Sequence, residues 1–282
     1  MKRSGVKELK KIANQIRQDI ITMLAKAGSG HPGGSLGMAD IFTALYFNLL
    51  NHTPQQANNP NRDRLVLSNG HICPVLYACL ARSGYFPLVK LKSLRQINSQ
   101  LQGHPHNLSL PGIENSSGPL GQGISQAVGM ALAGKLDKKN YSVFCITSDG
   151  EHDEGQLWEA VMAAKKYKLD NLIVIVDRNN IQIDGYTKNI MPIAPLKDKY
   201  ITFGWRVMTT NGHNLKQIIS TVKKAKAVKN KPTVIIAETI LGKGVRFMEN
   251  KYIWHLDTGR VIERNDVGEA VVMEEHDIEI AC

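Results

Sequence analysis

Two polar side chains follow two apolar segments that are typical of neighbouring parallel strands. Residues 143–147 run into Asp149, and residues 172–176 run into Asn179. Apolar residues at helical spacing over residues 156–168 predict a crossover helix between them. Parallel strands joined in this way bring their carboxyl ends to one edge of a sheet, so Asp149 and Asn179 should converge there. A carboxylate and an amide oxygen suit a hard cation such as Mg²⁺, which keeps water and phosphate oxygens as its other ligands.

Four histidines stand in or beside loops broken by glycine and proline. His31 lies in the run SGHPGGS, His104 lies in QGHPH, and His255 follows a Gly-x-Gly segment. His71 stands just before a helical stretch, where free N–H groups and partial positive charge favour an anion. Taken singly, His31 could merely orient its loop through the backbone, and His71 could be a buried, satisfied histidine.

A glycine-rich segment, GPLGQG from Gly118, comes directly before a helical stretch over residues 124–136. Such a helix entry lets backbone pack closely on a flat ring, although many folds use one. Together with SGHPGG, GHP and the Asp-Gly turn, it resembles the amino-terminal, diphosphate-binding domain of transketolase. The resemblance extends from Leu9 to about His255. It implies a thiamine diphosphate-binding α/β fold, a parallel sheet with helices on both faces.

The resemblance also implies roles for individual residues. Catalytic contacts with the substrate fall to His31, His104 and His255, because an unperturbed imidazole pKa of about 6.5 lets histidine accept and return a proton near neutrality. Glu154 matches a carboxylate that meets its counterpart across a subunit interface. Alternatively, it is a first-turn residue whose negative charge interacts favourably with the positive end of the helix dipole. The cofactor is expected against His71, Gly118, Leu120, Gly150, Asn179, Lys243 and His255. The metal, Mg²⁺ or Ca²⁺, is expected on Asp149, Asn179 and the carbonyl of Ile181.

The implied activity is that of a transketolase, which moves a two-carbon ketol unit from a ketose or its phosphate to an aldose. Full-length relatives carry a pyrimidine-binding domain after this one, and 282 residues leave no room for it. We therefore expect a split transketolase, with a partner chain supplying the pyrimidine-binding and carboxy-terminal domains in an α2β2 assembly. The motif set disfavours a deoxyxylulose phosphate synthase and the α chain of a 2-oxo acid dehydrogenase. A transketolase-like enzyme of a specialised sugar pathway and a catalytically silent paralogue remain alternatives.

The sequence departs from the family at several positions. Ser148 replaces the usual glycine before the metal aspartate, and His106 replaces a glutamate common in full-length enzymes. Leu256 replaces a glycine after His255, and the rest of the tail has no clear periodicity. We therefore expect a diphosphate-binding domain over residues 1–255 and a divergent tail over residues 256–282.

Composition places limits on the class of protein. The net charge is +10, but the basic residues are dispersed along the polar faces of predicted helices, which favours solvated faces over nucleic-acid binding. The four cysteines lack zinc-ligand spacing. The sequence shows neither a signal peptide nor a membrane span, so we expect a soluble, cytoplasmic protein.

Periodicity predicts the elements that position these residues. A helix over residues 6–27 should end at Gly28, and Ser35 should cap a helix over residues 38–50. Strands are expected over residues 64–67, 205–210 and 233–238, and helices over residues 74–81 and 215–228. Residues 186–200 are predicted to be loop, and the acids Glu151 and Asp153 to face solvent.

Overall fold

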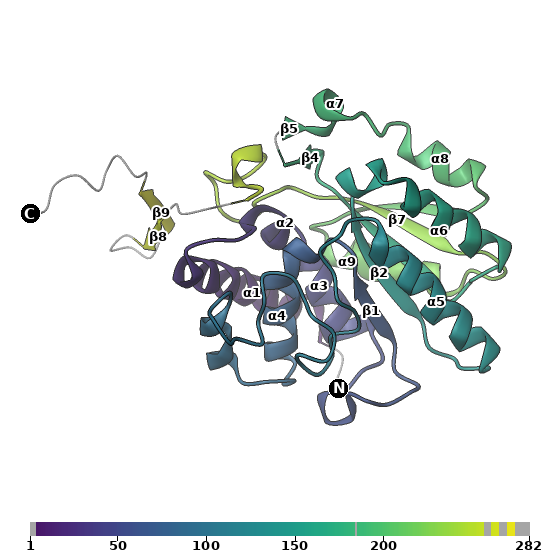
Figure 1. Cartoon of the computed structure of the whole chain (residues 1–282), viewed down its shortest axis with the longest axis horizontal. Coiled ribbons are helices and arrows are strands. Elements are labelled where there is room, and N and C mark those ends of the chain that lie inside the picture. The colour runs from purple at the N-terminus through teal and green to yellow at the C-terminus, as the bar shows by residue number, and fades with distance from the viewer. Residues whose placement is uncertain (1–3, 184, 257–260, 265–269, 274–282) are drawn as a thin grey trace, which may run out of the picture.

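A five-stranded, all-parallel sheet forms the centre of the computed structural model, which describes residues 4–183, 185–256, 261–264 and 270–273. The strands are ordered β1-β2-β3-β7-β6. Figure 1 shows the sheet with β1, β2 and β7 labelled. They comprise β1 (Arg64–Leu67), β2 (Val143–Ser148), β3 (Leu172–Arg178), β7 (Thr233–Glu238) and β6 (Arg206–Asn211). All five strands lie where the apolar runs predict them, to within two residues.

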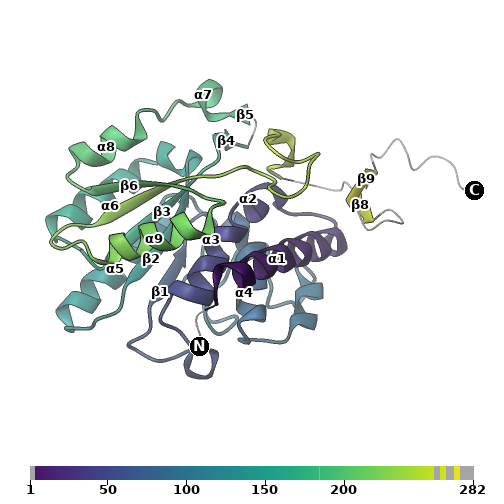
Figure 2. The same ribbon diagram turned by 180° about the vertical axis from the view of Figure 1, so that it is seen from behind.

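Helices cover both faces of the sheet, as a parallel sheet requires. Side chains alternate between the faces, so Phe144 and Ile146 of β2 join one core while Cys145 joins the other. The first core is covered by α1 (Val6–Ala27), α2 (Pro32–Gly37), α3 (Ala39–Ala44), α4 (Cys73–Arg82) and α9 (Leu215–Lys226). The second is covered by α5 (Gln122–Leu136), α6 (Gly155–Lys166) and α8 (Leu196–Thr202), as Figure 2 also shows.

The register of the sheet places the carboxyl ends of β2, β3 and β7 side by side. Ser148 pairs with Asp177 across β2 and β3, and Arg178 pairs with Glu238 across β3 and β7. The residues that follow these strands therefore lie at one edge. Short elements complete this edge, namely the 3₁₀ helices η3 (Gly70–Ile72), η5 (Gly150–Asp153) and η6 (Tyr252–Trp254), together with β4 (Ile181–Gln182), β5 (Gly185–Tyr186) and α7 (Thr187–Ile190).

The first helix confirms its predicted bounds. Gly28 ends α1 in the left-handed region (φ 65°), and its N–H donates to Leu24 O. The helix predicted over residues 38–50 is wrong in its start and form. It begins earlier, because Pro32 supplies a suitable first helical residue, and it ends as the π-helix η1 (Leu45–Leu49). Ser35 is inside α2 and is not a cap; its Oγ donates to His31 O at 2.7 Å.

The loop predicted over residues 186–200 is also wrong, because this segment holds α7 and most of α8. Proline suggested irregular backbone, but Pro195 immediately precedes α8, where its missing N–H costs nothing. Leu196 and Tyr200, one helical turn apart, bury against the second core. Tertiary packing therefore stabilises a helix that local signals did not indicate.

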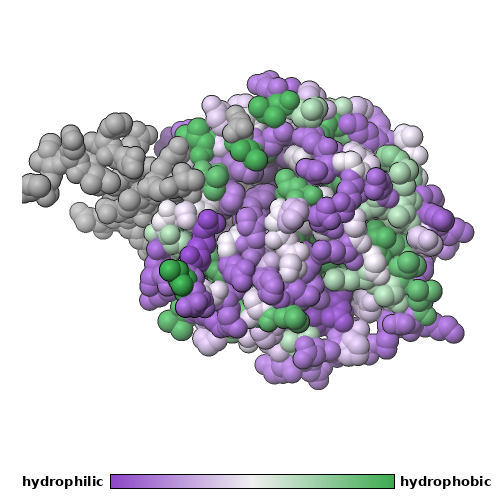
Figure 3. All heavy atoms as spheres, in the orientation of Figure 1, coloured by the Kyte–Doolittle hydropathy of each residue, from purple (hydrophilic) through white to green (hydrophobic). Residues whose placement is uncertain are grey.

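The segment after Leu256 contributes a short antiparallel pair, β8 (Val261–Arg264) and β9 (Ala270–Met273). The rest of the predicted tail, residues 257–260, 265–269 and 274–282, lies outside the described residues. The boundary at residue 255 stays a prediction. Within the described part of the chain, no helix is both long and apolar enough to cross a membrane. Hydrophilic side chains cover most of the face seen in Figure 3.

Candidate active site

Asp149 lies fully buried at the end of β2. Its Oδ2 accepts hydrogen bonds from the N–H of Asn180 (2.7 Å) and from Arg178 Nη1 (3.1 Å). Its Oδ1 accepts the N–H of Gly150 (2.9 Å). Burial raises the pKa of Asp149 to about 6, against the opposing effect of Arg178. The end of β3 therefore lies directly against the end of β2, as the strand topology predicts.

Asp177 is a second buried acid at the same edge. It accepts hydrogen bonds from Thr239 Oγ1 and from Asn179 Nδ2, the latter at 3.0 Å. Burial, together with the charge of Asp149, raises the pKa of Asp177 to about 7. A methyl group placed on Gly34 would lie 3.7 Å from Asp177 Oδ2. The acidic edge therefore adjoins α2, the helix that directly follows His31.

The donor set at this edge fits a hard cation. Asn179 presents Oδ1, which accepts the N–H of Ile181 at 2.9 Å and retains a second lone pair. Among the described residues, no three His, Cys, Asp or Glu side chains gather closely enough to hold a metal. A metal here would thus depend on the Asp149 carboxylate, the Asn179 amide and main-chain or non-protein oxygens. Mg²⁺ and Ca²⁺ are the cations that prefer such all-oxygen ligand sets.

The four predicted histidines gather into one cluster, although they come from four separate segments. The ring centroid of His31 lies 5.0 Å from that of His71, 5.8 Å from that of His255 and 6.2 Å from that of His104. His71 and His255 are 5.2 Å apart. His31 precedes α2, His71 belongs to η3, His104 lies in a loop, and His255 directly follows η6.

The cluster holds at least three of its imidazoles neutral. Burial, followed by the charges of His255, His104 and Arg95, lowers the pKa of His31 to about 3. Burial is also the main cause that lowers the pKa of His71 and of His104. The pKa of His31 therefore lies well below the near-neutral value expected for it, while the catalytic roles of His31, His104 and His255 stay predictions. As neutral rings, His31, His71 and His104 can each donate one hydrogen bond and accept another.

The glycine-rich segment lies beside the cluster. A methyl group placed on Gly118 (φ 147°) would lie 3.5 Å from the His104 ring. One placed on Gly70 would lie 2.5 Å from Ser117 Oγ. The positive φ at Gly118 and the close approach at Gly70 explain why glycine occupies these two positions. Leu120 is half-buried in the turn that leads into α5.

Glu151 is fully buried, so its predicted exposure is wrong. It accepts hydrogen bonds from Ser68 Oγ, from the N–H of Gly121 at 2.8 Å and from the N–H of Ser148 at 3.1 Å. Burial raises the pKa of Glu151, and these three donors act in the opposite direction. Glu151 therefore joins the ends of β1 and β2 to the glycine-rich turn. Asp153, as expected, is exposed.

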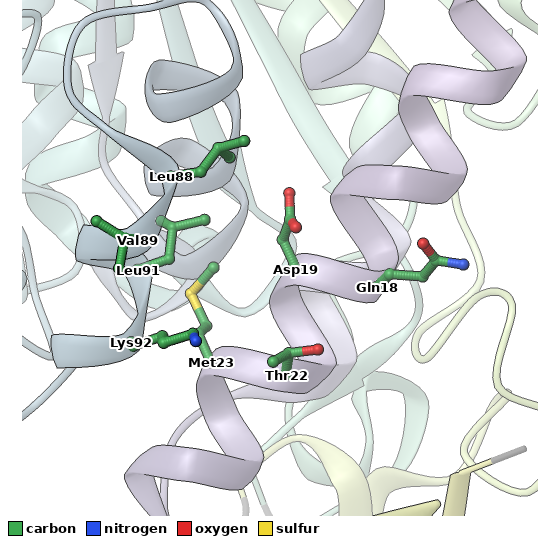
Figure 4. Close-up of a pocket in the computed structure, with 8 residues that line it drawn as sticks. All are labelled: Gln18, Asp19, Thr22, Met23, Leu88, Val89, Leu91 and Lys92. Carbon is green, nitrogen blue, oxygen red and sulfur yellow. The ribbon is translucent and has the colours of Figure 1, made fainter. Parts of the chain in front are cut away.

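Two further predicted residues, Glu154 and Lys243, belong to other parts of the surface. Glu154 is exposed at the start of α6, where a residue that meets another subunit would have to lie. Lys243 Nζ pairs with Glu249 at 3.0 Å, and Lys243 lines a groove with Arg17, Asp40 and His213. The interface role of Glu154 and the binding role of Lys243 stay predictions. A second groove, between α1 and the 3₁₀ helix η4 (Leu88–Ser93), contains none of the predicted site residues (Figure 4).

Unpartnered polar atoms mark the site as built for a polar ligand. Asn69 is fully buried, and neither its Oδ1 nor its Nδ2 has a partner among the residues described. The same holds for Nδ1 of His31 and for Oγ of Ser117. Buried polar atoms are normally satisfied, so their clustering here fits a phosphate-bearing cofactor.

The sequence did not single out Asn69, Asp177, Arg178 or Glu151 as site residues. Asn69 and Asp177 could have been found, because each stands at the carboxyl end of a predicted strand. Arg178 adjoins the predicted metal residue Asn179, but nothing in the pattern shows its contact with Asp149. The partners of Glu151 are 30 to 83 positions away, except for Ser148.

Comparison with known proteins agrees with this geometry. Residues 8–269 match the family model described as transketolase, thiamine diphosphate binding domain. The chain is 46% identical over 248 residues to a 6-deoxy-6-sulfo-D-fructose transketolase subunit of a Clostridium species, covering 88% of this chain and 90% of that one. It is 40% identical over 239 residues to an apulose-4-phosphate transketolase subunit of Phocaeicola vulgatus, covering 85% of each.

Solved structures give the same answer for the fold. Transketolase from Campylobacter jejuni superposes with a TM-score of 0.86 at 37% identity. The match covers 90% of this chain but 41% of that one, so the chain spans less than half the length of that enzyme. The chain thus belongs to the transketolase family and corresponds to its thiamine diphosphate-binding domain.

Proposed function

We propose that this chain is the amino-terminal subunit of a two-chain transketolase that transfers a two-carbon ketol unit from a ketose to an aldose. The observation that carries this proposal is that the histidine cluster lies next to the acidic edge. Gly34, three residues after His31, packs near the carboxylate of Asp177. Both named relatives at similar length are transketolase subunits. The partner chain would supply the pyrimidine-binding domain, in an α2β2 assembly in which Glu154 lies at an interface.

The cofactor would lie between the two halves of the site. Thiamine diphosphate supplies an electron sink for carbon–carbon bond cleavage, and the protein binds and orients it. His71, Gly118, Leu120 and Gly150 would hold it. The divalent ion, Mg²⁺ or Ca²⁺, would bind Asp149, Asn179 and the carbonyl of Ile181.

The remaining histidines would act on the sugar. His31 and His104 are neutral in this chain, so each can accept a hydrogen bond from a hydroxyl and donate one to a carbonyl oxygen. His255, whose ring lies beside those of His31 and His71, would take a third position around the substrate. The low pKa of His31 favours a role as hydrogen-bond donor and acceptor over one as a stored acid.

The substrate belongs to a specialised sugar pathway in this proposal. The two relatives at similar length carry names that refer to 6-deoxy-6-sulfo-D-fructose and to apulose-4-phosphate. Both sugars are anionic. The net charge of +10 is consistent with an anionic substrate and with a cytoplasmic enzyme that meets such metabolites.

Reconstitution tests the proposal. The chain is co-expressed with a candidate partner chain that carries a pyrimidine-binding domain, and ketol transfer is measured with thiamine diphosphate and Mg²⁺. We expect turnover from the pair and none from either chain alone. Calorimetry on the same pair should detect metal-dependent cofactor binding. Full activity of this chain by itself, or no cofactor binding by the pair, would contradict the proposal.

A further inference from the structure

Arg95 adopts an unusual backbone conformation close to the histidine cluster. It follows η4 and has φ 58°, in the left-handed region that residues other than glycine rarely enter. Its N–H donates to Leu101 O at 2.9 Å, which fixes the turn. Such conformations persist where the surrounding structure enforces them, and they concentrate at functional sites.

The side chain of Arg95 reaches the loops of two histidines. A methyl group placed on Gly103 would lie 2.6 Å from Arg95 Nη1, so the guanidinium rests on the residue next to His104. A methyl group placed on Gly30, the residue next to His31, would lie 3.9 Å from Arg95 Cδ. The side chain of Arg95 therefore lies beside the two segments that carry His31 and His104.

The charge of Arg95 has no counter-ion within the described part of the chain. Its side chain is in neither a hydrogen bond nor an ion pair there, and the residue is exposed. By contrast, Arg17, Arg62, Arg82 and Arg178 each pair with a carboxylate. The positive charge contributes to lowering the pKa of both His31 and His104, after burial in each case. An unpaired guanidinium at this position attracts an anion.

We propose that Arg95 binds the anionic group, phosphate or sulfonate, of the sugar that enters the histidine cluster. A guanidinium offers a planar set of donors that matches two oxygens of such a group at once. This inference rests on the proposed function and adds to it a preference for anionic over neutral sugars. It also places one determinant of substrate choice on this chain rather than on its partner.

The test uses the assembled two-chain enzyme with three ketose donors that differ only at C6: fructose 6-phosphate, 6-deoxy-6-sulfofructose and fructose. Ribose 5-phosphate and ribose are compared as acceptors in the same way. Arg95→Gln removes the charge, and glutamine should adopt the left-handed backbone conformation about as easily as arginine does. Arg95→Lys keeps the charge without the planar guanidinium. Lys92→Gln, from the same exposed segment, is the matched control.

We expect Arg95→Gln to lower kcat/KM for the anionic member of a pair by about ten- to hundredfold, mainly through KM, because a hydrogen bond between two charged groups is lost. The neutral sugar should change by less than about threefold. Arg95→Lys should restore part of the loss, and Lys92→Gln should leave all values near native. A loss limited to the phosphate or to the sulfonate identifies which group is bound.

An equal loss for charged and neutral sugars would overturn the proposal, as would a loss of the same size in Lys92→Gln. Titration calorimetry of fructose 6-phosphate and fructose into the same assemblies gives a second readout that needs no turnover. If the native enzyme binds the phosphate more tightly and Arg95→Gln removes that difference, Arg95 has the proposed role even where ketol transfer is undetectable. If Arg95→Gln keeps the difference, the proposal for Arg95 fails while the proposed function stands.

Discussion

Replacement of Glu151 by glutamine offers a sharp test of how the site is held together. The carboxylate accepts one hydroxyl and two backbone donors while fully buried. Glutamine has nearly the same shape, so it leaves no cavity. Its amide can still accept from Ser68 and Gly121 through one oxygen. Its NH₂ group would then face the N–H of Ser148, so two donors would oppose each other.

The expected cost follows from these contacts. An unsatisfied buried donor costs about 1–3 kcal/mol, and the two surviving bonds lose the strength that a charged acceptor gives them, for a total of about 3 kcal/mol. For a chain of this size that corresponds to a fall in Tm of roughly 6–12 °C. Because Glu151 joins Ser68 to the turn at Gly121, cofactor affinity should fall as well.

Urea and thermal unfolding of the purified chain measure the first effect, and calorimetry with thiamine diphosphate and the partner measures the second. Glu159→Gln, on the exposed face of α6, is the matched control and should unfold within about 0.5 kcal/mol of the native protein. A Glu151→Gln variant as stable as this control would refute the assignment of Glu151 as a buried acceptor.

Three further predictions concern the metal edge and a buried histidine. Asp149→Asn should weaken Mg²⁺-dependent cofactor binding at least about tenfold while the circular dichroism spectrum stays native, because the charged metal ligand is lost; unchanged calorimetry would contradict this. Arg178→Gln should lower the Mg²⁺ concentration for half-maximal cofactor binding by about tenfold, because a positive charge beside Asp149 is removed; an unchanged or higher midpoint would count against it. Burial lowers the pKa of His152 to about 4, below its unfolded value of 6.5. Between these two values the unfolded chain binds more protons than the folded one. The stability that the buried, neutral His152 contributes is therefore lost as the pH falls from 6.5 towards 4. The stability of the native protein relative to His152→Gln should therefore fall by about 2 kcal/mol between pH 7 and pH 4.5 in urea unfolding, and a constant difference would exclude it.

The sequence by itself determined the strands, the order of the motifs and the family. Buried parallel strands appear as short apolar runs, so β1 and β7 are found at their predicted bounds. Because parallel strands share one carboxyl edge, the proximity of the Asp149 and Asn179 segments also followed from the sequence. The glycines beside His31 and His104 marked the loops that approach each other.

Only the tertiary structure decided which polar groups are buried and what they contact. Glu151 follows an exposed-looking Asp-Gly turn, yet its burial depends on Ser68 and Gly121, which the sheet brings to it from other segments. The low pKa of His31 arises from burial and from three charged or titratable side chains that are close in space but distant in the sequence. Arg95 reaches the cluster through a left-handed turn that local residue preferences disfavour. Such properties depend on distances through space, which periodicity and spacing along a chain do not specify.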